Sequence, residues 1–497
     1  MKLLTLAPDL DPIEDGILLD CSAVVPTLRG IAGAPSGVLV NPALTALAAT
    51  CVGAASVVKT SGDTRTFAGT ATQLYEEAGT LWATVTAATG AYTSVVDRWR
   101  FAQYGDVTLA ASKENVLQFS NGSGAFAAVT STATGSTVTA PAAAIVEVIN
   151  DFVFLGDTIS GPVYSSDNPD RWWASALGDY QRWTPDIGVQ CVTGRLTSVP
   201  GKITAIRKFG SQPVVYKERG MYLGSYVGPP VIWAFQEVPT ANTGTWGQES
   251  VIALGTPEQP FHFFVGREDF YIFDGARPVP VGHGIKEYFF SVLNVSSAGK
   301  IICLHDRANS LVYIYYPTGS STTLNAALVF HYRTKKWGRD DRSIVYAFEH
   351  LTTGVTYDSI GGLYSTYDDL ANVAYDNLAP SGKTPQPSFF TGTHGLYALT
   401  GSATQSSITS RDLGTDAAIT SIQRVTPRWI TKPQQAVLTN YQWMASGDTP
   451  AVDASSIMDN GRFDILRSAA WHRFVIDFTG PWEANFLKVD ASEDGYE

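Results

Sequence analysis

The chain has 497 residues, of which 44% are hydrophobic and 16% are charged, well below the roughly 25% charge of an average soluble domain. A surface so poor in charge is buried readily against neighbouring subunits, which favours a component of an assembly. The net charge of −12 argues against a protein that grips DNA through clustered cations, but not against one that surrounds DNA without gripping it.

Residues 1–60 are predicted to form an N-terminal segment that closes or supports the main domain. The stretch Met1–Leu10 has one positive charge and is soon interrupted by acidic residues, so it does not resemble a signal peptide. The longest apolar stretch, Val38–Val58, contains Asn41 and Pro42 and is too polar for a membrane span. We therefore expect no membrane span and synthesis in the cytoplasm.

From about residue 60 onward, short runs of Val, Ile, Phe, Tyr and Thr alternate with Gly, Asp, Asn or Pro. Three segments each read as strand, turn and strand: His262–Asp274, Ile301–Tyr316 and Tyr346–Tyr364. Repeated small antiparallel units hide their edges when they are arranged around an axis. The sequence therefore predicts an all-β fold with a β-propeller core over residues 61–385, with about six blades. A many-stranded sandwich is the structural alternative.

Helical periodicity is scarce. The best candidate is Ile285–Leu293, in which Ile285, Tyr288, Phe289 and Val292 share one face, so a short helix on a loop is expected. The stretch Gly122–Ala144 is rich in Ala, Thr, Ser and Gly, and it reads either as a flexible loop or as an outer strand pair.

Pro380–Pro387 reads as a linker. Beyond it, residues 386–497 are predicted to form a separate β-rich region, with strands at Phe463–Leu466 and Trp471–Phe478. The pattern does not assign a role to this region.

Motifs for catalysis, cofactors and metals were sought by spacing. The four cysteines lie too far apart for a C-x-x-C site, and they read as buried thiols: Cys21, Cys51, Cys191 and Cys303. The seven histidines never occur as H-x-x-x-H or H-E-x-x-H, so no metal site is expected: His262, His283, His305, His331, His350, His394 and His472. No G-x-S-x-G, Walker or dinucleotide motif is present either. We predict no enzyme and no cofactor.

Ser165–Trp172 fits the S-x-D-x-G-x-T-W pattern of the Asp-box hairpin in sialidase propellers, except that Pro169 replaces Gly and Arg171 replaces Thr. In that hairpin the Asp caps turn amides and the Trp packs between strands, which is a structural role. The motif, with 12 Trp, 22 Tyr and 23 Phe that can stack on sugars, leaves open a propeller glycosidase or a carbohydrate-binding protein.

The densest basic patch lies between residues 333 and 342. One interpretation is a contact with DNA or a partner, with Trp337 as the anchor; the other is a hairpin turn with Trp337 in the core. Asp340 and Asp341 dilute the charge and favour the hairpin. The candidate contact residues are Arg333, Lys335, Lys336 and Arg339.

Three stretches carry a resemblance to a known family. They are Arg98–Asp106 (RWRFAQYGD), Trp172–Thr184 (WWASALGD followed by WT), and Tyr216–Gly282, which includes YKERGMY, YVGPP and FYIFDG. Together they resemble the β-propeller tail nozzle or tail-hub proteins of short-tailed bacteriophages. The resemblance covers roughly the middle two thirds of the chain, and residues 386–497 depart from it most.

The resemblance implies a structural protein of the virion tail, made in the host cytoplasm. It implies a homo-oligomeric ring, commonly a hexamer, below the portal or head-to-tail adaptor protein and above a tail fibre, needle or tip protein. Double-stranded DNA would be retained in the ring and then passed without sequence-specific binding. The acidic composition agrees, because a lumen without rows of cations does not trap phosphates.

Overall fold

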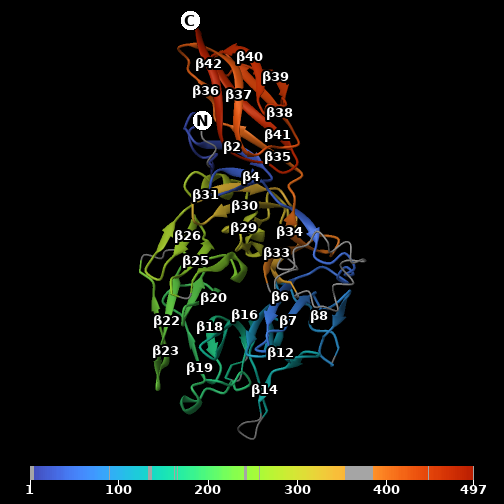
Figure 1. Cartoon of the computed structure of the whole chain (residues 1–497). Coiled ribbons are helices and arrows are strands. Elements are labelled where there is room, and N and C mark those ends of the chain that lie inside the picture. Colours follow the sequence, from blue (N-terminus) through green and yellow to red (C-terminus); the bar gives the residue numbers. More distant parts are fainter. Residues whose placement is uncertain are drawn as a thin grey trace.

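The computed structural model describes residues 5–495 apart from 89, 132–136, 162, 165, 240–242, 257, 353–383 and 446. Small antiparallel sheets are arranged around an axis, and a second β-structured body is stacked on one side of them (Figure 1). Both ends of the described chain lie in or beside this second body.

Each propeller unit is an antiparallel sheet of four strands connected in sequence order, as expected where short apolar runs are separated by tight turns. Unit 1 consists of β6 (Gly53–Val58), β7 (Thr64–Gly69), β8 (Leu74–Ala78) and β9 (Leu81–Thr84). Unit 2 consists of β10 (Arg100–Tyr104), β11 (Val107–Ser112), β12 (Asn115–Asn121) and β13 (Ala127–Ala128). Unit 3 consists of β16 (Ala142–Ile149), β17 (Phe152–Ser160), β18 (Asn168–Ala174) and β19 (Val192–Arg195).

The later units follow the same plan. Unit 4 consists of β20 (Ile203–Phe209), β21 (Gln212–Lys217), β22 (Met221–Gly228) and β23 (Ile232–Glu237). Unit 5 consists of β24 (Val251–Gly255), β25 (Pro260–Val265), β26 (Phe270–Phe273) and β27 (Pro278–Pro280). Unit 6 consists of β28 (Ile302–Asp306), β29 (Leu311–Tyr316), β30 (Ala326–His331) and β31 (Lys336–Asp340). Unit 7 consists of β32 (Tyr346–Leu351), β33 (Pro385–Phe390), β34 (Leu396–Gly401) and β5 (Ser36–Leu39).

The first strands of these units form a closed ring. Each of β6, β10, β16, β20, β24 and β28 contacts the next first strand, and β32 contacts β6. The β-propeller prediction is therefore confirmed. Within the described residues, the first strands of seven units form this ring.

The last unit is completed by the N-terminal segment. Strand β5 pairs with β34, with Val38 opposite Ala398. The expected boundary near residue 385 falls at the start of β33, which pairs with β32, so the propeller continues to Gly401. Pro385 and Pro387 fit this strand although proline has no N–H to donate. They pair with β32 alone, because β34 does not extend to them, so no second neighbouring strand requires a hydrogen bond from them. Residues 380–383 of the expected linker lie outside the described residues, and residues 385–387 belong to β33 rather than to a linker.

The second body, here called the sandwich, has two facing sheets. Sheet I consists of β1 (Thr5–Leu6), β2 (Ile17–Ser22), β35 (Gln405–Ser410), β41 (Trp471–Thr479), β38 (Gln435–Trp443) and β39 (Ala451–Ser456), with β36 (Leu413–Gly414) beside β41. Sheet II consists of β4 (Ile31–Gly33), β42 (Glu483–Gly495), β37 (Ile419–Thr431) and β40 (Phe463–Ala469). The two strands predicted in this region are thus present as β40 and β41.

The sandwich is joined to the propeller by a continuous sheet. Strand β3 (Val24–Pro26) pairs with β31 of unit 6 on one side and with β4 of sheet II on the other. A single cluster of buried residues runs from units 5 and 6 into the sandwich, where the Phe478 and Trp482 rings stack at 3.9 Å. The two bodies therefore share one hydrophobic core.

The other local predictions have mixed outcomes. The expected helix is present as α1 (Lys286–Val292), with Ile285 and Phe289 buried. Gly122–Ala144 contains the outer strand pair β14 (Thr130–Ser131) and β15 (Val138–Thr139). The hairpins around residues 266–269 and 306–309 are confirmed, whereas most of the third, beyond residue 352, lies outside the described residues. In the described part of the chain, every helix is too short or too polar to cross a bilayer.

Candidate functional site

The axis of the propeller is occupied by a buried ionic cluster. Arg100, at the start of β10, donates from Nε and Nη2 to the two carboxylate oxygens of Glu249, at 2.8 and 3.0 Å. Arg98 forms a second ion pair with Glu249, at 3.1 Å. All three side chains are buried, so this carboxylate is neutralised by two guanidinium groups inside the fold.

The cluster ties several units together. Arg100 also donates to the carbonyl oxygen of Ala144 in unit 3, and Arg98 donates to that of Lys300, just before unit 6. Burial alone raises the pKa of Glu249, but Arg100 and Arg98 outweigh it and bring the pKa down to about 2. Glu249 is therefore held ionised as a structural anion.

Around this cluster, the first strands of the units line an axial cavity of about 360 Å³. Glu349 on β32 forms an ion pair with Arg307 at 2.8 Å and lies 3.4 Å from His305. Burial raises the pKa of Glu349, but the hydrogen bonds with these two partners outweigh it and leave the pKa lowered. Glu147 on β16 lies 3.5 Å from Arg207, and burial raises its pKa. The cavity is far too small for a DNA duplex, whose major groove alone is ~12 Å wide.

The position of the basic hairpin between β30 and β31 is fixed by the packing of Trp337. This side chain is buried between Phe330 and Phe270, with ring centroids 4.5 and 4.8 Å away. The structure therefore confirms the hairpin with a core tryptophan. Lys336 is half-buried beside it, and Arg339 is bound to Asp341.

The two remaining basic candidates, Arg333 and Lys335, are exposed on the turn between β30 and β31. We expect the Trp337→Phe variant to lose about 1–3 kcal/mol of unfolding free energy, because it empties part of a packed site and removes the indole donor to Val281. Arg333→Ala and Lys335→Ala should stay within about 0.5 kcal/mol of wild type. Urea unfolding measures all three; an equal loss in the Lys335 variant would contradict this assignment.

One of the two roles expected for the Asp-box-like segment, the packing of its tryptophan, is present. Trp172 packs between units 3 and 4, with its ring centroid 4.6 Å from that of Phe235. Asp167 forms an ion pair with Lys113 at 3.2 Å. Since Pro169 has no amide hydrogen, the turn lacks a donor at the position where the motif has glycine.

The cysteines and histidines take structural positions. All four cysteines are free and buried, and burial raises the pKa of Cys21 and Cys51 to about 12. His262 is buried, hydrogen-bonded to Tyr216 at 2.8 Å, and burial lowers its pKa to about 4. The described residues hold no group of three His, Cys, Asp or Glu that could bind a metal ion.

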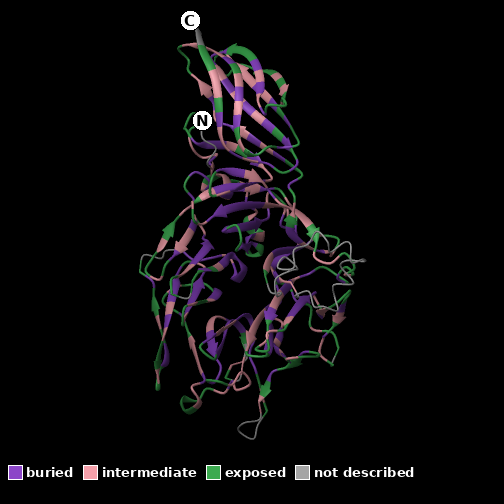
Figure 2. Ribbon diagram, in the orientation of Figure 1, coloured by how far each residue is buried: buried purple, intermediate pink, exposed green. Residues whose placement is uncertain are grey.

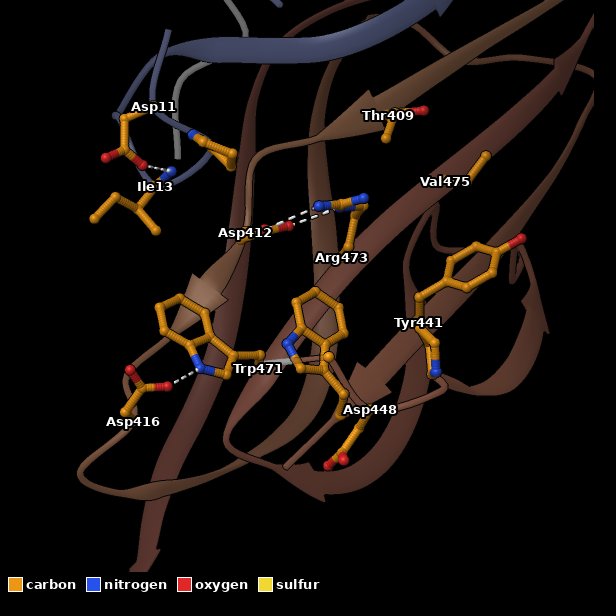
Figure 3. A pocket seen from close by; sticks show the side chains of 14 residues that line it. Asp11, Ile13, Thr409, Asp412, Asp416, Tyr441, Asp448, Trp471, Arg473 and Val475 are labelled. Atoms are coloured by element: carbon orange, nitrogen blue, oxygen red, sulfur yellow. Dashed lines mark hydrogen bonds and ion pairs between the residues drawn. The ribbon is translucent and has the colours of Figure 1, made fainter. Parts of the chain in front are cut away.

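A concave surface on the outer face of sheet I is here called the sandwich cleft (Figure 3). It encloses about 630 Å³. Its floor is set by strand pairing: Trp443 on β38 lies directly opposite Trp471 on β41, and the next outward pair is Tyr441 and Arg473. Figure 3 shows the Trp471 indole with its N–H directed at Asp416.

The polar groups of the sandwich cleft are held in fixed geometry. Arg473 binds Asp412 through two hydrogen bonds of 2.7 and 2.9 Å, and this partner raises the pKa of Arg473. Asp416 accepts the indole N–H of Trp471 at 2.6 Å. Asp448 accepts the backbone N–H of Ala445 at 2.9 Å.

A second surface feature, here called the end patch, lies at the end of the propeller away from the sandwich (Figure 1). Its large apolar side chains are each between 45% and 56% exposed: Leu177, Ile187, Tyr226, Val227 and Val231. The backbone N–H of Leu177 donates to Val189, and the Tyr226 hydroxyl donates to Gln190 at 2.6 Å. These links place the β22–β23 hairpin against the loop before β19.

Sequence reasoning missed both surfaces. The signal for the sandwich cleft was available in the alternation of β41, where Trp471, Arg473 and Val475 point outward and His472 and Phe474 point inward. A tryptophan at an outward position is unusual for the solvent face of an antiparallel sheet, where polar residues are expected.

Comparisons with known proteins give fold likenesses alone. No protein-family model and no curated protein matches the chain. YCF48 from Cyanidioschyzon merolae is 9% identical over 63% of this chain and 92% of its own, with a TM-score of 0.35. An exo-beta-1,3-galactanase from Phanerochaete chrysosporium is 9% identical over 91% of this chain and 100% of its own, with a TM-score of 0.29. The N-terminal domain of Nup159 is 13% identical over 53% of this chain and 72% of its own, with a TM-score of 0.30. Scores this low carry no argument about function.

Proposed function

We propose that the chain is a structural subunit of a bacteriophage tail, of the nozzle or hub type, and that its copies form a ring around the DNA ejection channel. The end patch carries the proposal. Several large apolar side chains are exposed on the β22–β23 hairpin and on the loop segment beside it, and exposed apolar side chains in neighbouring segments are typical of a protein interface. Part of this patch, at residues 226–230, belongs to the stretches that resemble the nozzle family.

The ionic cluster on the axis supports a passive role for the propeller. Arg98 and Arg100 neutralise Glu249 within the cavity, so DNA would pass between subunits and not through a propeller. The net charge of −12 suits a channel wall that does not retain phosphates. The portal or adaptor would lie at one end of the ring, and a fibre, needle or tip protein at the other.

The alternative is a propeller glycosidase, which needs two carboxylates at a shared opening, one of them able to donate a proton. On the axis of this propeller, Glu249, Glu349 and Glu147 each lie beside an arginine, although burial raises the pKa of Glu147. This pairing favours a structural use of the axial acids.

The ring is tested on the purified full-length chain by native mass spectrometry and negative-stain imaging, with and without co-expressed adaptor. We expect ring-shaped oligomers and, in virions, a ring-shaped layer of the tail. A chain that stays monomeric under all these conditions and is missing from virions would overturn the proposal.

A variant pair locates the interface. Val227→Asp places a charge in the end patch, and Val452→Asp places one on an equally exposed apolar site of β39 in the sandwich. We expect the Val227 variant to lose the ring while keeping the wild-type thermal midpoint, because burying an unpaired charge opposes association without affecting an exposed site of the monomer. The Val452 variant should assemble normally.

A further inference from the structure

We propose that the sandwich cleft is a binding site for a neutral oligosaccharide. The inference goes beyond the proposed tail function and does not rest on it. It starts from the outward face of β38 and β41, where a soluble antiparallel sheet normally presents polar residues. Here two tryptophans form a direct cross-strand pair, with a tyrosine and an arginine as the next pair.

The inward residues of the same strands explain why these aromatic side chains are not needed for the core. His472, Phe474 and Ile476 are fully buried between the two sheets, whereas Trp471 and Trp443 remain partly exposed at the cleft. Indole rings present flat apolar faces together with one N–H donor. Such faces match the C–H faces of a pyranose ring, which is apolar above and below and polar around its edge.

Carboxylates are placed beside these rings with acceptor capacity left over. Asp416 uses one oxygen for the Trp471 indole, and Asp448 uses one for the Ala445 amide. Among the described residues, the other oxygen of each carboxylate has no hydrogen-bond partner, although an ionised carboxylate can accept about four hydrogen bonds. Vicinal sugar hydroxyls are donors of the right kind for these oxygens.

The wall opposite β38 is preformed by the N-terminal segment. The carbonyl oxygen of Pro12 accepts the backbone N–H of Asp412 at 2.8 Å, and that of Ile13 accepts Arg411 at 2.6 Å. The enclosed volume of about 630 Å³ is within the range of roughly 300–1,000 Å³ found for small-ligand sites. A short oligosaccharide fits this size.

The charges that line the sandwich cleft favour an uncharged ligand. The lining contains four aspartates and one arginine, and the arginine is already paired with Asp412. A phosphorylated or acidic ligand would be repelled by Asp11, Asp416 and Asp448. A cationic peptide would be attracted to the aspartates, but the positively charged Arg473 guanidinium in the floor of the cleft would repel it. Such a ligand would also leave the two partly exposed indoles without a role. A neutral saccharide uses both the rings and the acceptors.

The experiment is isothermal titration of the full chain with gluco-, galacto-, manno- and N-acetylglucosamine oligosaccharides. At least one is expected to bind with a Kd of about 1 mM or tighter. Trp443→Ala and Asp416→Asn should each weaken that binding about tenfold or more, and Trp443→Tyr should restore part of it, since a ring face is regained.

A matched control keeps the result interpretable. Asp477→Asn makes the same charge change on the outward face of β41 outside the cleft; this variant should bind as wild type with an unchanged thermal midpoint. Absence of binding by all four saccharide series, or binding that the cleft variants leave unchanged, would overturn the proposal. So would tight binding of oligolysine that Asp416→Asn abolishes while saccharides bind nowhere. Ring formation is unaffected by any of these outcomes, so this test and that of the tail function fail separately.

Discussion

Replacing Glu249 by alanine should lower the free energy of unfolding by about 3–5 kcal/mol. The variant leaves the Arg98 and Arg100 guanidinium groups buried without their shared carboxylate. Urea unfolding followed by tryptophan fluorescence measures the loss.

The same cluster predicts an acid limit to stability. The folded pKa of Glu249, about 2, lies below its ordinary value of 4.5, so its contribution is complete above pH 4.5 and is lost as the pH falls toward 2. Wild type should therefore lose stability over this window more steeply than the Glu249→Ala variant. As a control, Glu349→Ala removes a carboxylate whose partner Arg307 is largely exposed, and it should cost about 1 kcal/mol or less. Equal losses in the two variants would contradict the assigned burial.

Deleting residues 1–40 should prevent cooperative folding, a destabilisation greater than about 5 kcal/mol. These residues supply β5 to unit 7, β2 to sheet I and β4 to sheet II. Their loss leaves β34, β35 and β42 with unpaired edges at the same time, and unpaired edges promote aggregation. The measurement is thermal unfolding and size-exclusion chromatography of the truncated chain.

A point variant in the same segment serves as the control. Leu28 is 65% exposed, so Leu28→Ser should leave the thermal midpoint unchanged. A truncated chain that elutes as a monomer and unfolds at the wild-type midpoint would show that the N-terminal strands are dispensable.

Local elements of the fold were predictable because their signals are local. The turn after Val265 and the helix from Lys286 depend on residues a few positions apart. The strand partners across the molecule were not predictable. Cys21 lies opposite Ile408 and Val38 opposite Ala398, and an alternating pattern indicates a buried face without indicating what pairs with its edge. The composition of units 2 and 7 was not predictable for related reasons: β13 has two residues, and β5 comes from the far end of the chain.

The surfaces were harder to predict than the fold. Trp443 and Trp471 become neighbours only through the register of β38 on β41, and Asp416 and Asp448 reach the cleft from two different loops. The basic hairpin was predictable because Trp337 and the diluting acids are adjacent in sequence. Side chains that are distant in sequence can be predicted to lie together only when the strand topology is already known.

The placement of β4 against β42 bears on the order of events during synthesis. Ile31 pairs with Ala484, so sheet II cannot form until nearly the whole chain has left the ribosome. Non-local pairing of this kind is slow, and the emerging units must wait with exposed edges. Completion of the last strand is therefore a late step: a nascent chain that has not yet reached Ala484 lacks the partner strand of β4 and cannot form sheet II.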